Sequence, residues 1–161
     1  DELEAVFLAA ALGLLEAFPG AHFDHAQLAM LASKWAGTHA LELAGDLHRT
    51  TGSAVAELVE RAAREGWQRD RLNTHLLSLF GSQRAETVAI TEVTRAITAG
   101  ESAIILLLAG AGIVLDPYHY TAADERVCLV CGVRHGAPIT DGRFPPLHPR
   151  CRCRTVWRER R

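Results

Sequence analysis

The chain has 161 residues, 48% of them hydrophobic, and a formal net charge of −2. This length suits one domain with a substantial core, or one domain and a small appendage. The near-zero charge argues against a globally basic nucleic-acid binder, and the apolar content argues against a disordered acidic chain. The charge is uneven, however, because residues 1–142 carry 10 basic and 18 acidic side chains, whereas residues 143–161 carry seven arginines and one acid.

The first 66 residues are expected to form long helices. The segment 1–18 has high helix propensity, is apolar on nearly all sides and stops at Pro19-Gly20. Between residues 24 and 66 the apolar side chains recur at helical spacing, with a weak point around Thr50–Ser53. The sequence therefore predicts that this second segment is a long helical hairpin or one broken helix.

Helical patterning continues beyond this segment. Residues 69–80 are typical of a short helix, and a well-patterned helix begins at Ser82. After Gly100 we expect another helical stretch, which runs to about Ala109. The longest apolar run, 103–115, has 13 residues, which is too short to span a bilayer. We therefore expect a buried helix that leads into a strand, and no membrane span.

Glu92 stands on the apolar stripe of the helix that begins at Ser82. A carboxylate that faces a core is costly unless it is paired. Arg95, one turn away, is the local partner, and Arg126 and Arg152 are candidate partners from the C-terminal segment. We expect Glu92 to anchor the C-terminal segment to the helical body through an arginine.

The helical period disappears near residue 121. Strand character surrounds Asp116-Pro117 and reappears at Thr155–Trp157. We therefore predict a mainly α fold, with a helical body over residues 1–111 and a small C-terminal α+β module, stabilised by zinc, over residues 112–161.

The candidate zinc ligands all lie in this C-terminal module. The pattern Cys128-x2-Cys131 is followed, after 16 residues, by His148-x2-Cys151-x-Cys153. A CxxC pair places two thiolates around one tetrahedral ion, so the second group must supply two more ligands. The spacing leaves open which of Cys151 and Cys153 joins His148.

We expect zinc at this site, with two disulfides or four free thiols as the alternatives. The acidic first residues do not resemble an export signal, so disulfides are less expected. Four protein ligands would make the zinc structural, and a module this small would depend on it for folding. A zinc deaminase places His-x-Glu before its CxxC, whereas His148 follows it, and an HNH-like nuclease needs more nearby histidines than His135. We therefore predict that the protein is not an enzyme.

The basic tail has two interpretations. Arg150, Arg152 and Arg154 alternate with cysteines, so a local strand would place them on one face that contacts phosphates or an acidic partner. Alternatively, these arginines pair with the acidic helical body. Every histidine before residue 120, His119 included, lacks companions at ligand spacing and is expected to be a surface or satisfied core residue.

Three stretches of the C-terminal half belong together: RAETVAITEVTRAITAG (84–100), TAADERVCLVCGVRHGAPI (121–139) and FPPLHPRCRC (144–153). In order, spacing and residue types they resemble the phage Mu F-like minor head proteins, also called the phage head morphogenesis family. The resemblance includes Glu92 and Arg95 in the first stretch and Asp124 and Arg126 in the second.

The resemblance implies a structural component of a tailed-phage or prophage virion. Such proteins associate with the portal vertex and act in head assembly or DNA delivery, so portal or capsid proteins are the expected partners. The protein would be found in the virion, or in the host cytoplasm during assembly. The family offers no catalytic residues to carry over. Direct DNA contact and oligomerisation stay open, and the alternatives are a zinc-stabilised nucleic-acid-binding module or the carrier domain of a larger phage-derived toxin.

Overall fold

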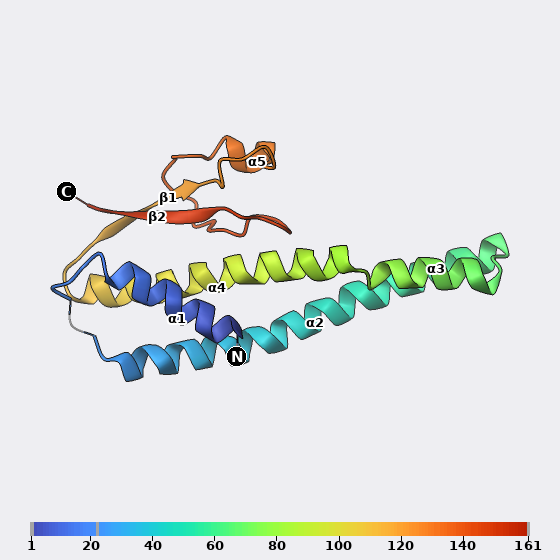
Figure 1. The fold of residues 1–161 in the computed structure, drawn as a ribbon, viewed down its shortest axis with the longest axis horizontal. Helices are drawn as coiled ribbons and strands as arrows, with labels where there is room; N and C mark the ends of the chain where they lie inside the picture. The colour runs from blue at the N-terminus through green and yellow to red at the C-terminus, as the bar shows by residue number, and fades with distance from the viewer. Residues whose placement is uncertain (1, 22, 161) are drawn as a thin grey trace. The chain divides into compact units, whose positions relative to one another are not determined.

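A computed structural model describes residues 2–21 and 23–160 of the chain. It is mainly helical, with a small two-stranded sheet near the C-terminus (Figure 1), as the sequence predicted. The elements in chain order are α1 (Glu2–Leu15), α2 (His25–Glu65), α3 (Arg69–Leu79), α4 (Ser82–Gly110), β1 (Leu115–Tyr120), α5 (Leu129–Gly132) and β2 (Arg154–Glu159).

The chain divides into two compact units. One contains the residues up to Ala36 together with those from Val88 onward, and the other is Gly37–Thr87. Helices α2 and α4 therefore contribute to both units. The predicted boundary between residues 111 and 112 falls inside the first unit, because the C-terminal module packs on α4.

In the second unit α2 runs unbroken through Thr50–Ser53, so the predicted hairpin or break is wrong. The hydroxyl of Thr50 donates to the carbonyl oxygen of Asp46, 2.9 Å away, which satisfies that side chain inside the helix. The guanidinium of Arg84 donates to the hydroxyls of Thr50 and Thr51 at 3.2 and 2.7 Å. These contacts give the polar side chains partners without ending the helix.

Helix α4 likewise continues through Gly100, where the sequence predicted a separation. A methyl group at this position would lie 2.2 Å from the carbonyl oxygen of Phe7 in α1. Gly100 therefore allows the backbones of α1 and α4 to approach closely. The core at this crossing includes Phe7, Ala11, Ile104 and Leu108, which are all almost fully buried.

Among the described residues one helical stretch, Arg69–Gly110, is long and apolar enough to cross a membrane by length and composition alone. Its C-terminal part contributes Ile104 and Leu108 to the core of the first unit. The absence of a membrane span stays a prediction.

Strands β1 and β2 form an antiparallel ribbon in which Leu115 faces Glu159 and Tyr120 faces Arg154. Within the first unit this ribbon runs beside α4, with α5 on its other side (Figure 1). The indole of Trp157 in β2 donates to the carboxylate of Glu101 in α4 at 3.1 Å. The ribbon thus holds the segment 121–153, which carries every cysteine, next to α4.

Candidate metal centre

Helix α5 positions the first pair of candidate ligands. Cys128 is its N-cap residue, and the backbone N–H of Cys131 donates to the Cys128 sulfur at 3.4 Å. Because α5 is a single helical turn, the two thiols point toward the same side. The same hydrogen bond lowers the pKa of the Cys128 thiol from its ordinary value, which favours the thiolate form that metals bind.

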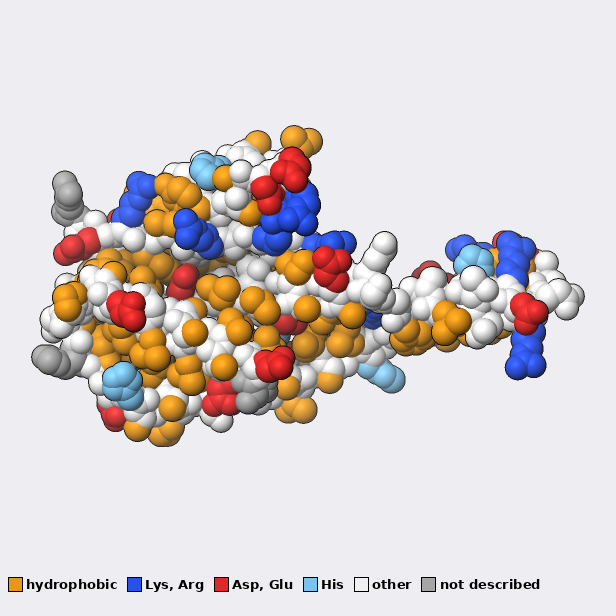
Figure 2. Space-filling model, in the orientation of Figure 1, with side chains coloured by type: hydrophobic (Ala, Val, Ile, Leu, Met, Phe, Trp, Pro, Cys, Tyr) orange, Lys and Arg blue, Asp and Glu red, His pale blue; other side chains and the backbone are white. Residues whose placement is uncertain are grey.

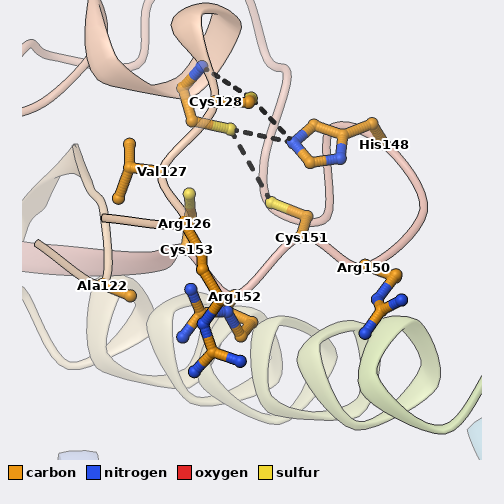
Figure 3. Close-up of a pocket in the computed structure, with 10 residues that line it drawn as sticks. Ala122, Arg126, Val127, Cys128, His148, Arg150, Cys151, Arg152 and Cys153 are labelled. Atoms are coloured by element: carbon orange, nitrogen blue, oxygen red, sulfur yellow. Dashed lines mark hydrogen bonds between the residues drawn. The ribbon is translucent and has the colours of Figure 1, made fainter. Parts of the chain in front are cut away.

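His148 supplies a ring nitrogen to these sulfurs. Its Nε2 lies 3.2 Å from the sulfur of Cys128 and 3.2 Å from that of Cys131 (Figure 3). On the other side of the ring, Nδ1–H donates to the carbonyl oxygen of Pro149 at 2.8 Å. That bond leaves the lone pair of Nε2 facing the thiols, which is how a ligating histidine is normally oriented.

Cys151 lies next to this group of three. Its sulfur lies 4.0 Å from that of Cys131, and all four cysteines of the chain are free thiols. A tetrahedral zinc ion, with bonds of about 2.3 Å to sulfur and about 2.0 Å to nitrogen, would hold sulfurs about 3.8 Å apart and a sulfur and nitrogen about 3.6 Å apart. The separations from His148 to Cys128 and Cys131 and from Cys131 to Cys151 lie within a few tenths of an ångström of these values, whereas Cys151 lies farther from at least one of the other two ligands. Cys128, Cys131 and His148 can therefore hold one metal ion, and Cys151, next to Cys131, is the candidate for a fourth ligand.

Cys153 belongs to a second group. A ring nitrogen of His119 and the sulfurs of Cys131 and Cys153 lie within 4.8 Å of one another, and all three residues are buried. Burial raises the pKa of the Cys153 thiol to about 11 and also raises that of Cys131. A metal that binds these sulfurs must therefore displace protons.

His119 is the main residue that sequence reasoning missed. We expected a surface or satisfied core histidine, but its side chain is buried and neither ring nitrogen has a hydrogen-bond partner among the described residues. Burial is the main cause that lowers its pKa, which favours a neutral, metal-binding imidazole. Only the pairing of β1 with β2 brings His119 near Cys153, so no local sequence pattern could reveal it.

Helix α4 holds the loop that carries the later ligands. The hydroxyl of Thr94 donates to the carbonyl oxygen of Cys151 at 2.8 Å, and the N–H of Arg150 donates to the hydroxyl of Thr91 at 3.0 Å. Both threonines belong to the segment TEVTR and flank Glu92. Sequence reasoning missed them, although the motif that contains them was part of the family resemblance.

Glu92 forms its ion pair with Arg95, which lies one turn away in its own helix. The buried carboxylate of Glu92 accepts two hydrogen bonds from Arg95, at 2.7 and 2.9 Å. Arg152, one of the donors expected for Glu92, instead binds Asp124 through two hydrogen bonds of 2.6 and 2.7 Å. The guanidinium of Arg126 lies 3.9 Å from Asp124. The pair Asp124–Arg152 thus connects the chain before the CxxC turn to the last cysteines, and Arg152 lowers the pKa of Asp124.

The predicted basic face does not form as a strand, because β2 begins only at Arg154. Arg150 and Arg152 lie before it. Figure 3 shows Arg150 apart from Arg126 and Arg152. Over the C-terminal module, basic side chains lie next to acidic ones (Figure 2). The charge of these arginines is therefore partly balanced within the module.

The candidate metal centre joins three sequence segments that are far apart: the TEVTR segment of α4, the CxxC turn, and the loop from His148 to Cys153. No family model matches the chain, and no match is found among curated proteins or solved structures.

Proposed function

We propose that this chain is a minor head protein of a tailed phage or prophage, which acts at the portal vertex in head morphogenesis or DNA delivery. Its C-terminal module is a structural unit stabilised by zinc, and it presents a fixed surface to portal or capsid proteins. The protein belongs in the virion, and in the host cytoplasm during assembly. It is not an enzyme.

One observation carries this proposal. The three stretches on which the family resemblance rests, 84–100, 121–139 and 144–153, meet at a single site. Thr94 of the first stretch binds the backbone of the third, and Asp124 of the second binds Arg152 of the third. The residue types shared with the family thus have a common physical role, which is to hold one folded module together.

The composition of this module supports a structural role for zinc. Its local core cluster consists of Cys131, Cys151 and Cys153, with only a few apolar neighbours such as Val127 and Leu147. Three thiols offer little apolar surface for a loop of this length, which supports the proposal that a bound ion supplies folding energy. A closed set of protein ligands also leaves no coordination position for a substrate.

Reconstitution with portal rings and with procapsids tests the proposal. The zinc-loaded chain should cosediment with one of them, and the chain treated with a chelator should not, because its module loses its shape. The matched control is His135→Ala, which alters a histidine of the module outside the first ligand set and should cosediment like the wild type. Failure of the zinc-loaded chain to associate with portal or procapsid would contradict the assembly role.

The same preparation distinguishes the nucleic-acid alternative. That alternative requires DNA affinity with a steep salt dependence, which falls when Arg150 and Arg154 are neutralised. Arg152→Ala serves as the comparison, because Asp124 already engages its guanidinium. Strong DNA binding without portal association would favour the alternative over assembly.

A further inference from the structure

The starting observation is the environment of His119. Its backbone is fixed on both sides, because its N–H donates to Ala137 at 2.9 Å and its carbonyl accepts from Gly136 at 2.8 Å. The side chain is 1% exposed, and within the described part of the chain neither ring nitrogen has a hydrogen-bond partner. A buried polar atom without a hydrogen-bond partner destabilises the folded state. A buried imidazole whose backbone is fixed and whose ring nitrogens lack partners is suited to bind a metal ion.

The atoms that His119 faces are sulfurs. Its nearest ring nitrogen, the sulfur of Cys131 and the sulfur of Cys153 lie within 4.8 Å of one another. Cys131 also belongs to the group formed with Cys128 and His148. One thiol is therefore shared between two sets of ligand atoms on neighbouring parts of the same cluster.

We propose that His119 and Cys153 bind a second metal ion, which shares the Cys131 thiolate with the ion held by Cys128 and His148. This inference rests on the metal centre of the proposed function. Two four-coordinate ions need eight ligand positions, and the cluster has six side chains. Six side chains fill eight positions when two thiolates bridge. Cys131 belongs to both groups and is placed to be one bridge. Cys151, whose sulfur lies 4.0 Å from that of Cys131 but in neither group, would move closer to the ions to be the other.

Charge balance agrees with two ions. One zinc with three thiolates and a neutral histidine would carry a net charge of −1, and Cys153 would remain a buried thiol beside it. Two divalent ions neutralise four thiolates completely. Because buried net charge is unfavourable, the paired arrangement suits this buried cluster better.

The strand opposite His119 carries a second buried polar group without a partner among the described residues. His119 faces Thr155 across the ribbon, and the Thr155 hydroxyl is also buried without a partner among the residues described. A ligating histidine donates its second ring N–H to an acceptor. The two groups do not bond to each other in this structure, so a bond to the Thr155 hydroxyl requires the imidazole to turn toward Thr155 when the ion binds.

The number of metal ions per chain tests the proposal directly. Native mass spectrometry of the zinc-loaded chain should find two zinc ions, and His119→Ala should retain one. The control His135→Ala should retain two, because His135 binds the hydroxyl of Thr121 and lies outside both ligand groups. One zinc ion in the wild type, or two in His119→Ala, would overturn the proposal.

Cobalt substitution tests the shared thiolate without any mutation. Titration of the metal-free chain with Co²⁺ should give thiolate-to-cobalt absorption that saturates at two equivalents. The electron paramagnetic resonance signal should fall as the second ion enters, because bridged Co²⁺ ions couple. Two ions without coupling would refute the bridge. One zinc ion with portal association would refute this inference alone, whereas two zinc ions without portal or procapsid association would refute only the proposed function.

Discussion

Gly100 is the position at which the packing of the first unit is most sensitive to one added carbon atom. A methyl group there would lie 2.2 Å from the carbonyl oxygen of Phe7 and 3.0 Å from its carbonyl carbon. An ordinary carbon–oxygen contact is about 3.3–3.6 Å. The obstacle is backbone and cannot rotate away, so Gly100→Ala must separate α1 from α4 by about 1 Å, the difference between these distances.

Two effects of opposite sign determine the outcome. Alanine favours the helix over glycine by about 0.5–1 kcal/mol. Overpacking costs about 1–3 kcal/mol, and separation of the helices also loosens contacts of Phe7, Ile104 and Leu108 in the core. We expect the clash to win, so that Gly100→Ala lowers the free energy of unfolding by about 2 kcal/mol.

Gly13 in α1 is the matched control, because a methyl group there meets nothing within 4 Å. Gly13→Ala should therefore raise the free energy of unfolding by about 0.5–1 kcal/mol. Urea unfolding followed by far-ultraviolet circular dichroism, at equal zinc loading, measures both variants. If Gly100→Ala is as stable as the wild type, α1 and α4 do not approach as closely as described.

Three further changes test contacts made by side chains of α4. Thr94→Val removes the buried hydrogen bond to Cys151, so it should cost about 1–3 kcal/mol and weaken zinc binding in a competition assay with a chelator. Glu92→Gln removes the charge that pairs with Arg95 and should destabilise the fold by about 1–3 kcal/mol in urea unfolding. Glu101→Gln should stabilise the fold at neutral pH, because burial raises the pKa of Glu101 and so makes its ionisation unfavourable to the folded state.

The sign of the Glu101 effect gives a pH test. Stability of the wild type falls as the pH rises from the unfolded-state pKa through the raised folded-state pKa, because the unfolded chain ionises more readily. The advantage of Glu101→Gln should therefore shrink as the pH is lowered from neutral toward that pKa. An advantage that does not change with pH would contradict this explanation.

For Thr94→Val the control is Thr74→Val, whose hydroxyl donates to the carbonyl oxygen of Asp70 in its own helix. Unchanged stability of Glu92→Gln would contradict the role of its ion pair.

Several features of this protein follow from local sequence alone. Helix propensity and apolar spacing predicted helices near Glu2–Leu15 and Arg69–Leu79, because helix hydrogen bonds join residues close in the chain. The strand character around Asp116-Pro117 likewise appears in β1. The spacing of Cys128, Cys131 and His148 indicated which side chains gather, since a CxxC turn is itself a local structure.

Other features depend on contacts between distant segments. Gly100 looked like a break, but the close approach of α1 makes it part of one helix. Arg152 pairs with Asp124, and not with Glu92, because the C-terminal loop folds back onto the segment before the CxxC turn. The division of the thiols between His148 and His119 depends on how β1 pairs with β2, and strand pairing is decided by the tertiary fold because its partners are far apart in sequence.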